Sequence, residues 1–184
     1  MRKLQLLLLI PIIAFISCEE RNPFGPPPYD VEGNLARDRG IIDDYLANTP
    51  IDSLYRIHDR SGVIVIVQEE GTGSRPITNS VVYTNYIGSL LDGSIFDTNI
   101  ESVARENDLH TENRTYVPLV FTIPELNSTG STIQGFGLGF RRLRSGSKGV
   151  LIIPSPYGYR NSESNENIPP NSVLRFDVEF LGLD

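Results

Sequence analysis

The sequence has little of the chemistry that metal and redox sites require. Among its 184 residues are one cysteine, two histidines, one methionine and no tryptophan. A single cysteine excludes an intramolecular disulfide, and with only two histidines it also excludes a cysteine–histidine metal cluster. We therefore expect no metal and no cofactor, and a fold whose stability comes from a packed core.

Basic residues are also in deficit. Lys and Arg together number 16 against 23 Asp and Glu, so the formal net charge is −7. Binding to a phosphate backbone relies on clustered positive charge, so this balance argues against nucleic acid as a partner. A length of 184 residues with 39% hydrophobic content is typical of one globular domain.

The N-terminus has the pattern of an export signal. Arg2 and Lys3 precede an apolar run over residues 4–15, which is too short to span a bilayer comfortably. The run ends at Cys18, and this arrangement resembles a bacterial lipoprotein signal. We expect removal of residues 1–17 and lipidation of Cys18, which would hold the protein on a membrane of the bacterial cell envelope. The alternative is an ordinary signal peptide in which Cys18 is incidental.

Two segments follow before the main domain. Residues 18–30 contain four prolines and predict an extended, semi-rigid linker. Residues 31–61 form an expected N-terminal helical extension, with a helix near 31–48 that Asp30 can cap and Pro50 can end. We interpret this helix as a spacer or packing arm; a role in dimerisation is the alternative.

From residue 62 onward the sequence has the two-residue period of β-strands. In 63–67 both sets of alternate residues are apolar, which predicts a strand covered on both faces. Residues 80–90 and 117–123 predict further strands, and Asp92-Gly93 is a turn signal. In 174–180 apolar and charged residues alternate, which is typical of an antiparallel sheet with one face in solvent.

One short helix is expected among these strands. Four apolar residues between Ile133 and Leu143 recur at helical spacing, and Ser131 or Thr132 can cap the helix start. The predicted fold class is therefore α+β. We expect a curved antiparallel β-sheet wrapping a short central helix, with the N-terminal helical extension added to it.

Four blocks of residues occur in a recognisable order between residues 62 and 184. They are Tyr86 with 90–93 and Phe96-Asp97, then 133–136, then 156–159, then 168–179. Together these blocks resemble the FKBP family of peptidyl-prolyl cis-trans isomerases. The resemblance implies an isomerase domain over 62–184, and the N-terminal helix with a lipoprotein signal is similar to exported bacterial members.

The resemblance also implies a prolyl-binding pocket. Its substrate-binding residues would be Tyr86, Phe96, Leu119, Ile133, Ile168 and Phe176. Three further residues would be catalytic: Asp97 as a buried carboxylate, Phe136 as the pocket floor, and Tyr159 as a phenol that donates to a substrate carbonyl. Phe136 stands where the family has tryptophan. Arg105 and Arg114 are both candidates for the arginine that pairs with Asp97.

The implied activity is isomerisation of prolyl bonds in segments of exported polypeptides, assisting their folding without a cofactor. This chemistry suits the residues present. Rotation about an X–Pro bond needs no proton transfer and no covalent intermediate, only a site that binds the twisted amide better than the planar one. The alternative is a catalytically weak or inactive FKBP-fold module for peptide binding or assembly, which the replacement of tryptophan by Phe136 leaves open.

Overall fold

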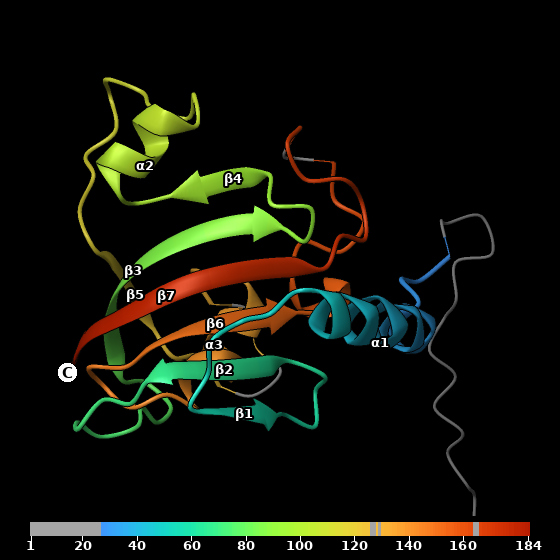
Figure 1. The fold of residues 1–184 in the computed structure, drawn as a ribbon, viewed down its shortest axis with the longest axis horizontal. Coiled ribbons are helices and arrows are strands. Elements are labelled where there is room, and N and C mark those ends of the chain that lie inside the picture. Colours follow the sequence, from blue (N-terminus) through green and yellow to red (C-terminus); the bar gives the residue numbers. More distant parts are fainter. Residues whose placement is uncertain (1–26, 126–127, 129, 164–165) are drawn as a thin grey trace, which may run out of the picture.

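The computed structural model describes residues 27–125, 128, 130–163 and 166–184, and its centre is a curved antiparallel sheet (Figure 1). The strands are β1 (Tyr55–His58), β2 (Ile64–Glu69), β3 (Val81–Leu90), β4 (Ile95–Thr98), β5 (Leu119–Thr122), β6 (Lys148–Ile153) and β7 (Leu174–Leu183). Their order is β1-β2-β6-β7-β3-β4. The first half of β3 pairs with β5, and its second half pairs with β4. The antiparallel sheet is as predicted.

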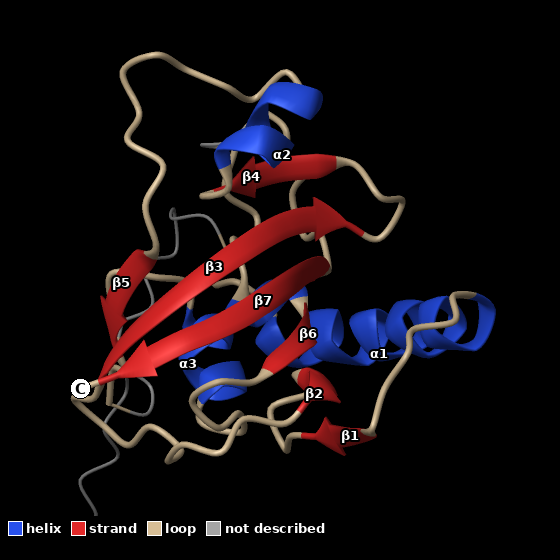
Figure 2. Ribbon diagram, turned by 60° about the vertical axis from the view of Figure 1, so that its left-hand side comes forward, coloured by secondary structure: helices blue, strands red, loops and turns tan. Residues whose placement is uncertain are grey.

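The short central helix is α3 (Gln134–Phe140), which lies beside the middle strands (Figure 2). Its glycines allow this close approach: a Cβ at Gly135 would lie 2.3 Å from the Ile153 side chain, and one at Gly139 would lie 2.8 Å from Leu151. The predicted cap is not formed. The helix follows Ile133 with no side-chain cap hydrogen bond, because Ser131 and Thr132 line a cavity instead.

Helix α1 (Val31–Asn48) covers the opposite face of β2 and β6. Its start is capped as predicted, since Oδ1 of Asp30 accepts the Gly33 N–H at 2.8 Å. Ile42 of α1 packs in a cluster with Ile64, Ile66, Val150 and Ile152, whereas the intervening residues of β2 face the core beside α3. β2 is therefore buried on both faces, as its uninterrupted apolar run predicted. The helix is a packing arm rather than a detached spacer.

The remaining extension differs from a wholly helical one. Tyr55–His58 forms β1, which pairs with β2 at the edge of the sheet. A strand of four residues is too short for its periodicity to stand out, and its place is decided by pairing with β2. Two further elements are α2 (Glu101–Glu106) and the 3-10 turn η1 (Ser155–Tyr157). The predicted signal, Cys18 and most of the linker lie outside the described residues, and no described helix combines the length and apolarity needed to cross a bilayer.

Candidate active site

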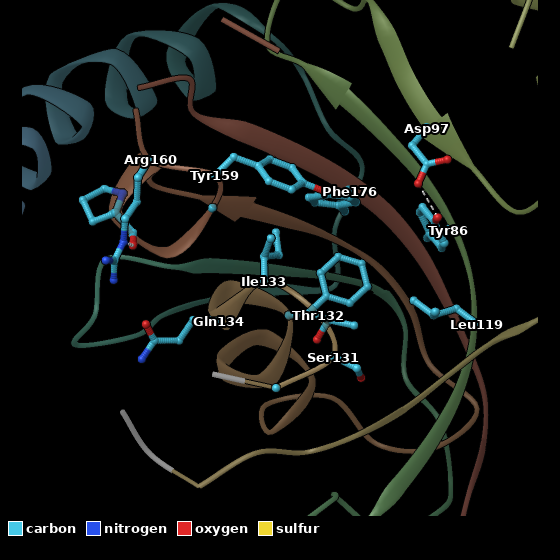
Figure 3. Close-up of a pocket in the computed structure, with 14 residues that line it drawn as sticks. Tyr86, Asp97, Leu119, Ser131, Thr132, Ile133, Gln134, Tyr159, Arg160 and Phe176 are labelled. Carbon is cyan, nitrogen blue, oxygen red and sulfur yellow. Dashed lines mark hydrogen bonds between the residues drawn. The ribbon is translucent and has the colours of Figure 1, made fainter. Parts of the chain in front are cut away.

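A cavity of about 500 Å³ opens between the start of α3, the sheet and the loop after β6 (Figure 3). This is a size typical of small-molecule and peptide side-chain pockets. Seven of the nine predicted site residues line it: Tyr86, Asp97, Leu119, Ile133, Phe136, Tyr159 and Phe176. They come from β3, β4, β5, α3 with the residue before it, the loop after β6, and β7. The curvature of the sheet brings these separate segments together.

The floor of the cavity is aromatic. Phe136 is only 2% exposed and meets Phe176 edge to face, with ring centroids 4.7 Å apart. Tyr86 lies at 6.0 Å from Phe136, also edge to face. These are favourable arrangements for aromatic rings, and they hold the floor rigid. Leu119 lines the cavity beside them.

Two predicted lining residues lie behind this floor. Phe96 is 5% exposed and contacts Phe176 and Tyr159 with its ring, so it supports the walls without lining the cavity. Ile168 is 3% exposed and belongs to the same core, and it too is absent from the lining. The structure therefore does not bring these two residues to the cavity surface.

Asp97 is held by two neighbours. The Tyr86 hydroxyl donates to Oδ2 of Asp97 at 2.5 Å (Figure 3), and Nη1 of Arg114 donates to Oδ1 at 2.7 Å. Nη2 of Arg114 also donates to the Tyr86 hydroxyl at 3.3 Å. Of the two candidate arginines the structure selects Arg114, because Arg105 instead pairs with Glu101 one turn away in α2. Asp97 remains 34% exposed, so the carboxylate is at the rim rather than fully buried.

These contacts shift the ionisation of both partners. Burial, followed by the hydrogen bond to Asp97, raises the pKa of the Tyr86 phenol far above its usual value. Burial lowers the pKa of Arg114, but its hydrogen bond and attraction to Asp97 outweigh that effect and raise the pKa overall. Tyr86 is therefore a neutral donor and Arg114 a cation at any physiological pH.

Arg114 reaches Asp97 because the insert after β4 is anchored at both ends. The Asn99 side chain is buried; its Oδ1 accepts the Tyr86 N–H at 2.8 Å, and its Nδ2 donates to the Val117 carbonyl at 2.9 Å. The Arg114 guanidinium also lies 5.4 Å from the ring centre of Tyr116. An arginine 17 residues after Asp97 thus becomes its neighbour through tertiary contacts, which spacing alone could not predict.

Tyr159 has a hydroxyl with no hydrogen-bond partner within the described part of the chain. Its ring packs edge to face on Phe96 at 6.4 Å. Burial and the nearby charge of Asp97 raise the pKa of this phenol, so it stays protonated. A half-buried aromatic ring with a free phenol is a donor available to a bound molecule.

Sequence reasoning missed several polar residues of the lining. Ser131, Thr132 and Gln134 flank Ile133, and Arg160 follows Tyr159. Ser131 and Thr132 were interpreted as helix caps, so they were not considered as lining residues. Gln134 and Arg160 could have been suggested by their positions next to the predicted site residues Ile133 and Tyr159. No group of three or more His, Cys, Asp or Glu suited to a metal ion occurs in the described ranges. The cavity combines an apolar floor with a few rim donors.

The family model for FKBP-type peptidyl-prolyl cis-trans isomerases matches residues 73–181. The chain belongs to this family. It is 30% identical over 120 residues to an FK506-binding protein of Neisseria meningitidis, covering 65% of this chain and 94% of that protein. It is 32% identical over 121 residues to the FKBP-type isomerase FkpA of Escherichia coli, covering 66% of this chain.

The sequence match spans 37% of the length of FkpA. The crystal structure of E. coli FkpA aligns with a TM-score of 0.60 at 27% identity, over 83% of this chain and 60% of the other. AtFKBP13 aligns with a TM-score of 0.54 at 25% identity, over 71% of this chain and 99% of the other. The FKBP fold is thus shown by sequence and by structure.

Proposed function

We propose that this FKBP-family chain catalyses cis-trans isomerisation of X–Pro bonds. The observation that carries the proposal is the convergence of seven predicted residues on one aromatic-floored cavity. A pyrrolidine ring is compact and apolar, so the floor formed by Phe136, Phe176 and Tyr86 suits it. Family membership supports the same activity.

The chemistry requires only that the cavity favour a twisted amide. Rotation is opposed by a barrier of about 18–20 kcal/mol, because the planar amide has partial double-bond character. The planar form is also the more charge-separated one, so an apolar, water-poor floor disfavours it relative to the twisted state. The floor around Phe136 supplies such surroundings. No proton has to leave the substrate.

Two donors would orient the substrate backbone. The Tyr159 hydroxyl and the backbone N–H of Ile133 belong to lining residues and have no partner among the described residues. We assign them to carbonyl groups on either side of the prolyl bond. Asp97 keeps its contacts with Tyr86 and Arg114 in this proposal, so its carboxylate fixes the Tyr86 ring in the cavity floor.

A protease-coupled assay with a proline-containing peptide tests the activity. We expect acceleration above the uncatalysed rate, and a loss in Asp97→Ala and in Phe136→Leu variants that remain folded. Leu181→Ala is a matched control, because Leu181 is 43% exposed on β7 and does not line the cavity. A folded wild-type protein that binds the peptide without accelerating its isomerisation would instead indicate a binding or assembly module.

We further propose that the protein is exported, that residues 1–17 are removed, and that lipidated Cys18 anchors it to a membrane of the bacterial cell envelope. The proline-rich segment 18–30 would then separate the isomerase domain from the surface, where it meets proline-containing segments of exported polypeptides. A Cys18→Ala variant is expected to lose its membrane fraction or remain as an unprocessed precursor. Normal processing with an unchanged membrane fraction would contradict lipidation.

A further inference from the structure

Helix α1 contacts the loop that carries Tyr159, although it lies outside the FKBP-like blocks. Asp38 of α1 has 0% of its surface exposed. Its Oδ2 accepts the Ser155 N–H at 2.7 Å, and its Oδ1 accepts from Nε of Arg37 at 2.9 Å. Ser155 is the first residue of η1, so the turn itself offers its N–H no acceptor. Asp38 satisfies this buried donor.

Ser155 in turn determines where Tyr159 lies. The Ser155 carbonyl accepts the N–H groups of Gly158 and Arg160, each at 3.1 Å. These two residues flank Tyr159 directly. Asp38 therefore fixes the start of the segment 155–160, and Tyr159 near the end of this segment lines the cavity.

Arg37 provides a second route to the same loop. Its Nη2 donates to the Asn171 carbonyl at 2.8 Å, and the Asn171 N–H donates to the Arg160 carbonyl at 2.6 Å. Arg160 and Asn171 have φ angles of 56° and 59°, in the left-handed region that non-glycine residues seldom adopt. Such conformations persist where surrounding contacts impose them.

The segment before α1 reaches this loop as well. The Tyr29 hydroxyl lies 3.2 Å from Oγ of Ser155, and the Arg160 guanidinium lies 5.7 Å from the centre of the Tyr29 ring. Arg160 is itself a lining residue of the cavity. The contacts of α1 and of Tyr29, which precedes its cap, thus converge on the Tyr159 side of the rim.

We propose that Asp38 and Arg37 are positioning residues of the active site, which hold Tyr159 in its place through Ser155 and Asn171. The inference rests on the proposed isomerase function, in which Tyr159 contacts the substrate. It gives the N-terminal helix a role in catalysis beyond packing: from outside the cavity, the helix supports the loop that carries Tyr159.

The test uses the whole mature chain with Asp38→Asn, which keeps the side-chain size and removes the charge. We expect kcat/KM for a proline-containing peptide to fall about tenfold, because small displacements of a positioned group cost that much or more. In the Tyr159→Phe background the same change should have almost no further effect. Non-additivity of this kind shows that Asp38 acts through Tyr159, which a general loss of stability would not produce.

Matched variants separate positioning from stability. Asp44 lies on the exposed side of α1, so Asp44→Asn should leave kcat/KM unchanged. Val150→Ala removes volume from the core beneath α1 and should lower the melting temperature while kcat/KM of the folded protein stays near wild type. Arg37→Gln keeps the Asp38–Ser155 contact but removes the hydrogen bond from Arg37 to the Asn171 carbonyl, so it provides a second test if Asp38→Asn does not fold. Arg37→Lys should retain more of the activity than Arg37→Gln.

Amide NMR shifts provide a readout that does not depend on turnover. Asp38→Asn should move the Gly158, Tyr159 and Arg160 signals, and Asp44→Asn should not. Unmoved signals, or additive losses with Tyr159→Phe, would overturn the inference. A wild-type protein without isomerase activity counts against the proposed function, and the NMR comparison then decides the positioning role separately.

Discussion

The two sides of the cavity are held by two different Asp–Arg pairs. On the β4 side, Asp97 and Arg114 form a pair at 2.7 Å whose side chains are 34% and 37% exposed. On the Tyr159 side, Asp38 has a fully buried side chain, whereas that of Arg37 is 42% exposed. Both arginines lie outside the four FKBP-like blocks.

The difference in burial has an energetic meaning. An exposed pair contributes at most about 1 kcal/mol, because water and salt screen it. A buried carboxylate loses its hydration and must be compensated fully, so removing its partners is far more costly. We therefore expect loss of the Asp97 pair to have a small effect on stability. Loss of the Asp38 pair should have a larger one, because the conformation of the loop at the rim depends on it.

The largest effect on stability is expected at the cavity floor, which lies between the two sides. Phe136→Ala removes a ring that packs on Phe176 and Tyr86, and should lower the free energy of unfolding by about 3–5 kcal/mol. Denaturant unfolding measures this loss. Phe180→Ala, in the same core but away from the cavity, should destabilise similarly while retaining more activity in the folded fraction. Equal activity losses would argue against a special role for the floor.

Next in size is the direct comparison of the two carboxylates. Asp38→Ala leaves the buried Ser155 N–H without its acceptor, and should cost about 2–3 kcal/mol of unfolding free energy. Asp97→Ala breaks a partly exposed pair together with the hydrogen bond from Tyr86, and should cost about 1–2 kcal/mol. Thermal or urea unfolding of both variants gives the ranking. The reverse order would contradict the difference expected between the two pairs.

Smaller changes in stability are expected when the hydroxyl of Tyr159 or of Tyr86 is removed, and the two variants should differ in activity. Tyr159→Phe removes a hydroxyl with no partner in the described structure, so the melting temperature should hardly change while kcat/KM falls about tenfold. Tyr86→Phe removes the donor to Asp97 and should lower stability by about 1 kcal/mol. If Tyr159→Phe retained full activity, the substrate contact assigned to this phenol would be wrong.

The smallest effect expected is that of pH. Burial and the charge of Asp97 raise the pKa of the Tyr159 phenol, so its protonated, donating form persists above the usual value of about 10. We expect kcat/KM to be constant between about pH 6 and pH 9. A pH–rate profile of the folded protein checks this, and a fall that Tyr159→Phe abolishes would show that the phenol loses its proton within this range.

Much of the fold was accessible from local patterns. The apolar run of β2, the alternation of β7 and the Asp30-capped helix α1 each predicted their elements, because periodicity reflects which faces are buried. The resemblance supplied seven of the lining residues. It also suggested Phe96 and Ile168, which support the cavity from behind; whether a side chain lines a surface or backs it depends on packing that no pattern encodes.

Strand alternation and the ordered family blocks are local properties of the chain, so they were enough to identify an α+β member of the FKBP family. Three contacts became known from the folded structure alone: which arginine meets Asp97, the pairing of Tyr55–His58 with the sheet, and the position of Asp38 beneath the Tyr159 loop. The first contact depends on the insert anchored by Asn99, the second on the pairing of β1 with β2, and the third on the docking of α1. Which residues meet in these contacts depends on burial and on the hydrogen-bonding needs of polar groups. Neither can be inferred from the spacing of residues along the chain.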